Sequence, residues 1–453
     1  MQPLPKEFEE QMKRLLGEAG FFAYLDALNQ PYARALRVNL LLRPDGTPPC
    51  PIEGLGAPVP WAKGAYFVEG DARPGLSPLH EGGLFYMQEP SALTAVTALD
   101  PQPGERVLDL CAAPGGKSTQ IAALMAGRGL LCCNEPIPSR AQILSRNIER
   151  MGVRNAVVLS AMPDALAPRF PAFFDRILVD APCSGEGMFR RQPEARDEWD
   201  ADAPRRCADR QMEILAQAAK MLRPGGTMVY STCTFNDTEN EGVLRRFLAL
   251  HPEFSLVPFA LPGLPEAKDG YLHLYPHEMR GEGHFVSRLK KADGADEADA
   301  PVQGAPQRKA PARAAAKGKA PAPIALPDVF SDAFAPERLY TAGDALWMLP
   351  EGISIERFSG LRVLRTGLLL AHAEGKRSEP DHALAMALRP EEAARTASLT
   401  QTQALAYQAG ETLSLGDLPG GYTLLCCEGV SLGWGKQAGG LMKNHYPKGL
   451  RRR

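Results

Sequence analysis

Short apolar runs alternate with amphipathic segments between residues 104 and 290 of the chain. Apolar runs bounded by turn residues predict buried strands, and apolar positions three or four residues apart predict helices. We expect strands at 106–110, 130–134, 156–159, 176–180, 226–231 and 284–289, a helix that begins near Ser118, and a second helix over 206–222. Strands that alternate with helices in this way indicate a parallel α/β sheet.

The hydrophobic pattern changes on both sides of this segment. Residues 1–80 begin with an amphipathic stretch over 5–17, continue with a strand-like run over 35–43, and then become rich in proline and glycine. Residues 291–327 are almost entirely alanine, proline, glycine and charged residues. They cannot bury enough apolar surface to fold, so a flexible linker is predicted. Beyond them, 328–453 predicts short strands and one helix over 390–406 in a smaller α/β module.

The composition sets limits on partners and compartment. A chain of 453 residues, 44% of them hydrophobic, is long enough for about two to four domains. Its formal net charge of −2 means that any nucleic-acid surface must be a local patch. The acidic N-terminus lacks the apolar region of a secretory signal, and no apolar run could span a membrane, so we expect a cytoplasmic protein with no membrane contact. The nine cysteines lack zinc-like spacing, so we expect no metal.

A candidate cofactor site lies over residues 107–120, where a strand runs through a glycine turn into a helix. Glycines allow close backbone approach, and the helix N-terminus offers free amide groups. A Gly-Gly turn alone is weak evidence, and neither phosphate-binding pattern, GxGxxG or GxxxxGK[ST], is present. Glu135 ends the next strand, where a carboxylate suits the two ribose hydroxyls, although an exposed strand-end acid is the alternative. The pattern favours an adenosine-type ligand without phosphates.

Two cysteines and an aspartate follow two other strands of the predicted sheet. Asp180 and Cys183 come just after one strand, and Cys233 comes just after another. The carboxyl ends of parallel strands meet at one crevice, so we expect these side chains to converge beside the glycine turn. The alternatives are a buried structural cysteine and a Pro-Cys turn without function.

This set suits methylation of cytosine at carbon 5, which is too weak a nucleophile to attack a methyl sulfonium unaided. A thiolate that adds to carbon 6 makes carbon 5 enamine-like and divides one difficult step into two. A carboxyl group protonates or hydrogen-bonds the ring at N3, and a base then removes the proton from carbon 5. An N- or O-methyltransferase would use the same cofactor turn but needs no thiol.

These segments closely resemble the Sun-type family of RNA (cytosine-5)-methyltransferases, and most closely its bacterial RsmF-like branch. The resemblance covers residues 1–290 and is most specific in LDLCAAPGGKST, VDAPCSGEGMFR and YSTCTFNDTENE. It implies a Rossmann-like class I methyltransferase with a doubly wound, mainly parallel seven-stranded sheet. It also implies transfer of a methyl group from S-adenosyl-L-methionine to carbon 5 of cytosine in RNA.

The resemblance also assigns roles to individual residues. Cys233, in the Thr-Cys motif, is the nucleophile; Cys183, in the Pro-Cys motif, assists product release; and Asp180 lies between cofactor and base. In DNA (cytosine-5)-methyltransferases the Pro-Cys cysteine attacks instead, so the order of roles follows from the family alone. Lys117 contacts Asp180 or an RNA phosphate, or is simply a lysine at a helix start, and Asp164 is the candidate for adenine contact. The expected S-adenosylmethionine contacts are Cys111, Ala112, Ala113, Pro114, Gly115, Gly116, Lys117, Glu135 and Asp180.

The resemblance extends to the C-terminal segments HALAMAL and GVSLGWGKQAGGLMKNHYPKGLRRR, the second of which is similar to a PUA-type RNA-binding domain. Basic residues there (Lys443, His445, Lys448 and 451–453) lie near Trp434 and Tyr446 in sequence, which suits phosphate contact with base stacking. A basic C-terminus without a partner is the alternative. The Arg-Val-Asn run at 37–39 is expected to contact RNA, as in the small N-terminal domain of the family.

We therefore expect an N-terminal RNA-binding domain over 1–80, the catalytic domain over 81–290, the linker over 291–327, and RsmF-type, PUA-like RNA-recognition modules over 328–453. The expected partner is 16S ribosomal RNA, free or within the small ribosomal subunit, and the protein is expected to be a monomer. Transfer RNA is the alternative substrate. A non-catalytic RNA-binding or ribosome assembly factor is the alternative of a different class, but it would have no need for the Cys183, Cys233 and Asp180 set.

Overall fold

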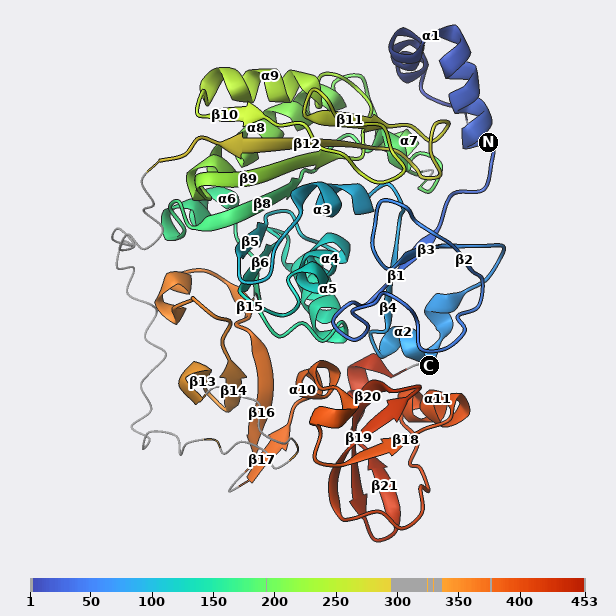
Figure 1. The fold of residues 1–453 in the computed structure, drawn as a ribbon, viewed down its shortest axis with the longest axis vertical. Coiled ribbons are helices and arrows are strands. Elements are labelled where there is room, and N and C mark those ends of the chain that lie inside the picture. The colour runs from blue at the N-terminus through green and yellow to red at the C-terminus, as the bar shows by residue number, and fades with distance from the viewer. Residues whose placement is uncertain are drawn as a thin grey trace.

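The computed structural model describes residues 3–192, 194–294, 324, 329, 336–374 and 377–451, and these contain four β-sheets. An N-terminal sheet lies beside a large central sheet, and two small C-terminal sheets form one end of the elongated molecule (Figure 1). Almost all of the predicted linker over 291–327 lies outside the described residues.

The central sheet has the strand order β10-β12-β9-β8-β5-β6-β7-β15, and β11 pairs with β12. The strands from β9 to β7 in that order are parallel to one another, which confirms the doubly wound, mainly parallel fold. The sheet has nine strands where the prediction gave seven, because β11 and β15 extend it. The bounds are β5 Arg106–Asp109, β6 Leu130–Asn134, β7 Ala156–Leu159, β8 Phe174–Asp180, β9 Leu222–Thr232, β10 Phe254–Leu256, β11 Tyr271–Leu274, β12 His284–Lys291 and β15 Val363–Arg365.

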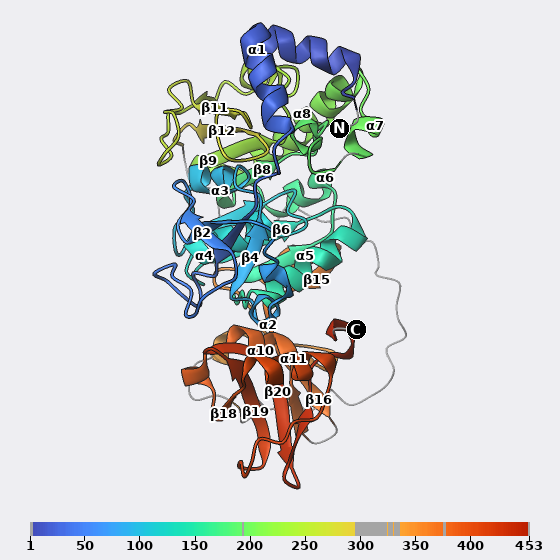
Figure 2. The same cartoon turned by 90° about the vertical axis from the view of Figure 1, so that its right-hand side faces the viewer.

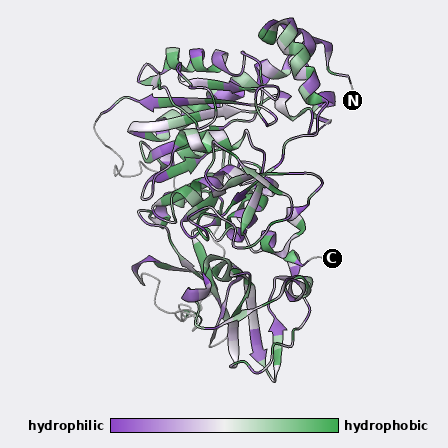
Figure 3. Cartoon of the chain, turned by 45° about the vertical axis from the view of Figure 1, so that its right-hand side comes forward, coloured by the Kyte–Doolittle hydropathy of each residue, from purple (hydrophilic) through white to green (hydrophobic). Residues whose placement is uncertain are grey.

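Helices cover both faces of the central sheet and close two apolar cores. Helices α3 (Leu93–Leu99), α4 (Gly116–Leu124) and α5 (Pro138–Arg150) cover one face. Helices α6 (Pro163–Leu166), α8 (Ala203–Met221) and α9 (Glu241–Leu250) cover the other. Hydrophobic and hydrophilic residues alternate along these helices (Figure 3), as expected for helices with one buried face. Helix α8, predicted over 206–222, ends at Met221, and the Arg-Pro-Gly-Gly run that follows already belongs to β9.

The N-terminal part consists of the long helix α1 (Lys6–Leu28), kinked at Gly17, and a four-stranded antiparallel sheet. Its strand β4 lies beyond residue 80, where the prediction placed the domain boundary. The polar side chains of the run at 37–39 are buried: Arg37 donates to Thr119 Oγ1 at 2.8 Å, and Asn39 Nδ2 donates to the Met151 carbonyl at 3.0 Å. They join this sheet to the catalytic part and do not face RNA. The bounds are β1 Ala35–Val38, β2 Leu55–Pro58, β3 Ala65–Val68, α2 Pro78–Glu81 and β4 Phe85–Gln88.

The C-terminal part contains two four-stranded sheets, β13-β14-β16-β17 and β18-β19-β20-β21, which lie together below the catalytic part in both views (Figure 2). The bounds are β13 Leu339–Ala342, β14 Ala345–Met348, β16 Leu368–Glu374, β17 Arg377–Pro380, α10 His382–Ala387, β18 Thr396–Ser398, α11 Gln401–Ala409, β19 Gly421–Cys427, β20 Val430–Ala438 and β21 Leu441–Asn444.

Two predictions for the C-terminal part are wrong. The helix over 390–406 is replaced by strand β18 and by α11, because β18 pairs in parallel with β19 and Thr400 caps α11 through a capping box with Gln403. Trp434 and Tyr446 do not present free rings for base stacking, because both are buried in apolar cores. The Trp434 indole donates to the Asp381 carbonyl at 2.8 Å, as a buried indole N–H requires a partner.

Candidate active site

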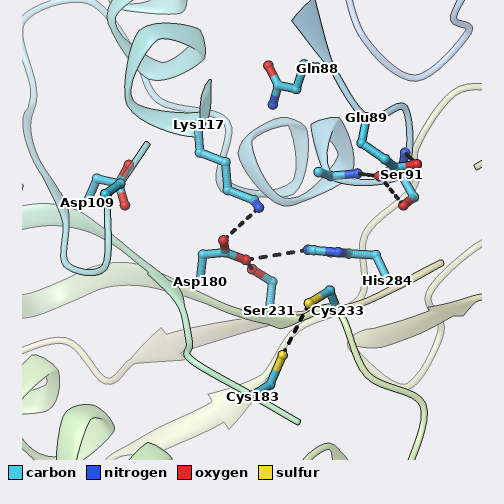
Figure 4. Close-up of polar contacts among 12 residues, drawn as sticks. Gln88, Glu89, Ser91, Asp109, Lys117, Asp180, Cys183, Ser231, Cys233 and His284 are labelled. Carbon is cyan, nitrogen blue, oxygen red and sulfur yellow. Dashed lines mark hydrogen bonds and ion pairs between the residues drawn. The ribbon is translucent and has the colours of Figure 1, made fainter. Parts of the chain in front are cut away.

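The carboxyl ends of β5, β8 and β9 open onto a cavity of about 730 Å³. The predicted residues Cys183 and Cys233 lie on its wall with Asp180, although the two cysteines are fifty positions apart in the sequence. Figure 4 shows these side chains with their polar neighbours. Lining residues from the prediction are Cys111, Ala113, Glu135, Asp164, Asp180, Cys183 and Cys233.

Asp180 is held by three polar side chains at the floor of the site. Lys117 Nζ lies 2.7 Å from Oδ2, Ser231 Oγ donates to Oδ1 at 2.8 Å, and His284 Nε2 lies 3.6 Å from Oδ1 (Figure 4). Burial opposes ionisation of the carboxyl group, but Lys117 and His284 outweigh it and lower the pKa of Asp180 well below its ordinary value. Asp180 is therefore a carboxylate at neutral pH and accepts hydrogen bonds.

The two cysteines contact each other directly. Cys183 Sγ and Cys233 Sγ lie 3.3 Å apart, within hydrogen-bond distance for sulfur and well beyond a disulfide bond. The hydrogen bond to Cys233, together with burial, raises the pKa of Cys183 well above its ordinary value. Cys183 therefore carries its proton at neutral pH and can donate it to the sulfur of Cys233.

Two buried glutamates, which the sequence did not single out, join the loops that carry the cysteines. Glu186 accepts hydrogen bonds from the backbone N–H groups of Phe235 at 2.7 Å and Asn236 at 3.0 Å. From the other loop, Glu239 accepts from the Ser184 N–H at 3.0 Å and from Gln211 Nε2 at 2.8 Å. Because buried carboxylates need such donors, each glutamate fixes the loop opposite to its own, and the two thiols are held at a constant separation.

The cavity wall near β6 has the groups that an adenosyl ligand requires. Glu135 is only 2% exposed, and its carboxylate accepts from the Ile137 N–H at 3.0 Å and faces Arg140 at 3.2 Å. Ile137 and Met162 also line the cavity, and they are 50% and 61% exposed. The Glu135 carboxylate suits the ribose hydroxyls of S-adenosylmethionine, and the uncovered side chains of Ile137 and Met162 suit its adenine ring. The sequence did not single out Ile137 and Met162, because their only signal is an apolar residue shortly after a strand.

The glycines of the turn, Gly115 and Gly116, allow close packing between helices and do not line the cavity. Gly115 has a φ of 113°, and a side chain there would lie 3.2 Å from Leu144 Cδ1. A side chain at Gly116 would lie 3.2 Å from a ring carbon of Tyr86 in strand β4. The positive φ of Gly115 favours glycine there, and a side chain at either position would press on α5 or on the N-terminal sheet. Among the predicted cofactor contacts, Ala112, Pro114, Gly115, Gly116 and Lys117 are absent from the cavity lining.

Asp109, at the end of β5, is fully buried beneath this turn. Its Oδ2 accepts a hydrogen bond from Ser118 Oγ at 2.6 Å, while Oδ1 has no partner among the described residues. Burial raises the pKa of Asp109 to about 7, against the weaker opposing effect of Ser118.

We expect Asp109→Asn to change how stability depends on pH. Between about pH 4 and pH 7 the folded wild type keeps a proton that the unfolded chain loses, so its stability falls as pH rises, by on the order of 4 kcal/mol in total. Asparagine does not titrate, so the variant should lack this loss. Urea unfolding of both proteins across this range measures the difference, and parallel stability curves would contradict a raised pKa at Asp109.

Two features define the class of protein. Strand β12 lies antiparallel between β9 and β10, and a cavity large enough for a nucleoside lies beyond the ends of β5 and β6. Together they define a Rossmann-like methyltransferase. Family comparisons agree along almost the whole chain. Residues 96–290 match the family model described as "16S rRNA methyltransferase RsmB/F". The RsmF N-terminal domain matches 4–90, the RsmF first C-terminal domain 327–388, and the RsmF PUA domain 394–452.

Curated relatives define the family. A "Ribosomal RNA small subunit methyltransferase F" of Erwinia tasmaniensis is 34% identical and covers 98% of this chain and 96% of its own. The protein of that name from an Enterobacter species is 35% identical and covers 98% and 95%. The chain belongs to the 16S rRNA methyltransferase RsmB/F family, and it is a methyltransferase.

Solved structures share the catalytic fold. A methyltransferase homologue from Pyrococcus horikoshii is 30% identical, with a TM-score of 0.54 over 63% of this chain and 95% of that one. NSun6 from Pyrococcus horikoshii, solved with SFG, has a TM-score of 0.55 and covers 64% and 99%, and at 22% identity it shows a common fold. No helix in the described ranges is long and apolar enough to cross a membrane.

Proposed function

We propose that the protein transfers the methyl group of S-adenosyl-L-methionine to carbon 5 of cytosine in 16S ribosomal RNA, through a covalent bond between Cys233 and carbon 6. The observation that carries this proposal is the pair of thiols at 3.3 Å beside the ionised Asp180. An amine- or oxygen-directed methyltransferase has no use for paired thiols. The names of the curated relatives support ribosomal RNA as the substrate.

Each protein group has a defined part in the reaction. Cys233 attacks carbon 6 as a thiolate, and the displaced electron pair makes carbon 5 nucleophilic. When bound, S-adenosylmethionine supplies the methyl group that carbon 5 accepts. Asp180, as a carboxylate, accepts a hydrogen bond from the amino group of cytosine rather than donating a proton at N3.

Cys183 completes the release of product in this mechanism. As the bond between carbon 6 and sulfur breaks, the proton of Cys183 passes to Cys233, and Cys183 takes up the proton that leaves carbon 5. Both thiols are then restored and the ring regains its double bond. The raised pKa of Cys183 supports this step, because Cys183 must hold a proton before release.

The substrate assignment is tested with purified protein, labelled S-adenosylmethionine, 16S ribosomal RNA, small ribosomal subunits and transfer RNA. We expect 5-methylcytidine in ribosomal RNA, identified by mass spectrometry of the nucleosides. Methylation of transfer RNA alone would show that transfer RNA, and not ribosomal RNA, is the substrate. Methylation at an amino or hydroxyl group, or none with any RNA, would overturn the proposal.

Glu135 supplies a direct test of the cofactor site. Glu135→Ala should weaken S-adenosylmethionine binding by about 10- to 100-fold, because charged hydrogen bonds to the ribose hydroxyls are lost. Calorimetric titration with S-adenosylmethionine measures the loss, and Glu253→Ala is the control, since Glu253 lies at β10, away from the cavity. Equal affinities of Glu135→Ala and wild type would remove Glu135 from the cofactor site.

We further propose that RNA follows a groove between the N-terminal and catalytic parts. This groove, of about 800 Å³, is lined by Arg34, Arg73, Arg190 and Arg280 against two acids, Glu69 and Asp71. Tyr32 on its wall is 45% exposed. Arg190 is already paired with Glu282, and Arg280 with Glu69. Arg73 and the exposed ring of Tyr32 are therefore the groups on this wall that suit a phosphate and an unstacked base.

Substitutions in the groove should weaken RNA binding without changing cofactor affinity. We expect Arg73→Glu and Tyr32→Ala each to raise the dissociation constant for RNA, and Arg73→Glu to reduce the salt dependence by about one charge. Fluorescence anisotropy at several salt concentrations measures both quantities. Lys220→Glu is the control, because Lys220 is exposed in the last turn of α8 and does not line the groove. Unchanged binding in both groove variants would place the RNA elsewhere.

A division into domains belongs to the same proposal. We place an N-terminal RNA-binding domain before the catalytic domain, with the boundary after β4, and RNA-recognition modules after residue 327. The sheet membership of β4 and the separate C-terminal sheets support this division. The protein is proposed to act as a monomer in the cytoplasm.

A further inference from the structure

His284 is a buried side chain at the active site to which the mechanism above gives no role. It begins β12, it is 3% exposed, and its imidazole points at Asp180 (Figure 4). Its Nε2 lies 3.6 Å from Asp180 Oδ1 and has no closer hydrogen-bond partner among the described residues. A buried polar atom without a partner is costly, so the position of this nitrogen requires an explanation.

The backbone holds the imidazole in this place from both sides. In the register of β12 with β9, Phe285 pairs with Thr232, which places His284 beside Cys233. On the other side, His284 pairs with Leu274 of β11. A side chain on β12 is therefore fixed relative to Asp180 and Cys233 together.

The residues before His284 are anchored as well. The Glu282 N–H donates to Glu89 Oε1 at 2.9 Å, and the Glu282 carboxylate forms two hydrogen bonds with Arg190, at 2.8 and 2.6 Å. The two side chains of this ion pair are only 9% and 3% exposed. The loop cannot withdraw without leaving buried charges unpaired, so His284 remains close to Asp180.

The contacts of Asp180 show what the imidazole can do. Lys117 lies at Oδ2 and Ser231 at Oδ1, and His284 approaches Oδ1 from a third direction. A carboxylate has about four lone-pair positions, so three protein contacts fix its orientation and leave acceptor capacity for a ligand. His284 also helps, with Lys117 and against burial, to lower the pKa of Asp180.

We propose that His284 is a positioning residue for methyl transfer: it fixes the Asp180 carboxylate through Oδ1 so that a free lone pair meets the amino group of the target cytosine. The inference rests on the proposed function. His284 acts through Asp180 and has no contact with the base of its own. The small contraction from 3.6 Å to hydrogen-bond distance accompanies binding of the base, since catalytic hydrogen bonds tighten in the reactive complex.

The test compares variants that keep or remove the donor. His284→Phe, which cannot donate, should lower kcat by about 10- to 100-fold while KM for RNA and affinity for S-adenosylmethionine stay within about twofold. His284→Gln retains an N–H donor and should restore most of kcat. His273→Gln is the matched control, because His273 lies in the adjacent strand β11 but pairs with Glu241 at 2.7 Å.

A double-mutant cycle separates this role from a purely structural one. In the Asp180→Asn background, His284→Phe should cause no further loss in single-turnover rate, because its effect passes through Asp180. Three outcomes would each overturn the proposal. The rate losses of His284→Phe and Asp180→Asn could multiply in the double variant. His284→Phe could keep the wild-type kcat, or His284→Phe and His284→Gln could lose activity equally. If His284→Phe fails to bind S-adenosylmethionine, His284→Leu, which also lacks a donor, replaces it.

The experiments distinguish a failure of the proposed function from a failure of this inference. If the wild type does not methylate RNA, the function itself is wrong. If the wild type methylates cytosine and His284→Phe matches it, only the role of His284 is wrong.

Discussion

Cys233→Ala should abolish both methylation of RNA and formation of a protein–RNA adduct, whereas Cys183→Ala should accumulate an adduct that survives denaturation. Without the Cys233 thiolate, carbon 5 of cytosine is never activated, and the rate should fall by roughly 10⁴-fold or more, as for the loss of other covalent nucleophiles. Without Cys183, attack and methyl transfer still occur. The proton relay that frees carbon 6 is then missing, because its donor lay 3.3 Å from the leaving sulfur.

Denaturing gels after incubation with RNA and S-adenosylmethionine measure the adduct, and labelled methyl groups measure turnover. Cys207→Ala is the matched control, because Cys207 is a partly buried free thiol on α8 outside the cavity lining. An adduct in Cys233→Ala would exchange the roles of the two cysteines. Methylation by Cys233→Ala without any adduct would exclude covalent catalysis.

Asp180→Asn is the second substitution with a large expected effect. We expect kcat to fall by about 10²- to 10³-fold, as when a catalytic site loses one of its preorganised polar groups. The amide offers a single oxygen and no charge, so it cannot accept from cytosine as the carboxylate does. The variant also removes the counter-charge of the largely buried Lys117, whose Nζ lies 2.7 Å from Asp180 Oδ2 in the wild type.

Single-turnover methylation at saturating S-adenosylmethionine measures this loss, and calorimetric titration shows whether cofactor binding survives. Asp209→Asn is the control, because Asp209 is an exposed residue of α8 that pairs with Arg246 at 3.0 Å and lies outside the cavity lining. Near wild-type turnover of Asp180→Asn would remove the carboxylate from the chemistry. A similar loss in Asp209→Asn would show that the effect is not specific to the active site.

The sequence predicted the central sheet because its strands follow a local rule. Apolar runs between turns predicted β6 and β7 at their observed bounds, and the carboxyl ends of parallel strands had to meet. The convergence of Asp180, Cys183 and Cys233 followed from topology alone. The individual roles of the cysteines came from the family resemblance, because spacing does not distinguish an attacking thiol from an assisting one.

What the sequence missed depends on contacts between distant segments. The stretch over 390–406 has residues suited to a helix, but pairing of β18 with β19 outweighs that local preference. Trp434 and Tyr446 stand among basic residues in sequence, yet both rings point into cores formed by other strands. His284 and Glu186 carried no signal, since a lone polar residue near a strand end looks the same whether or not it meets a catalytic group.

Strand β15 has a consequence for how the protein is made. It pairs antiparallel with β7 at the edge of the catalytic sheet, and the Ser160 N–H donates to the Arg362 carbonyl at 2.9 Å. During synthesis every other strand of that sheet is complete before residue 365 leaves the ribosome. Until then β7 is an open edge, free to pair with strands of neighbouring chains. A nascent chain truncated before residue 363 would therefore carry a finished catalytic centre and an unprotected, aggregation-prone border.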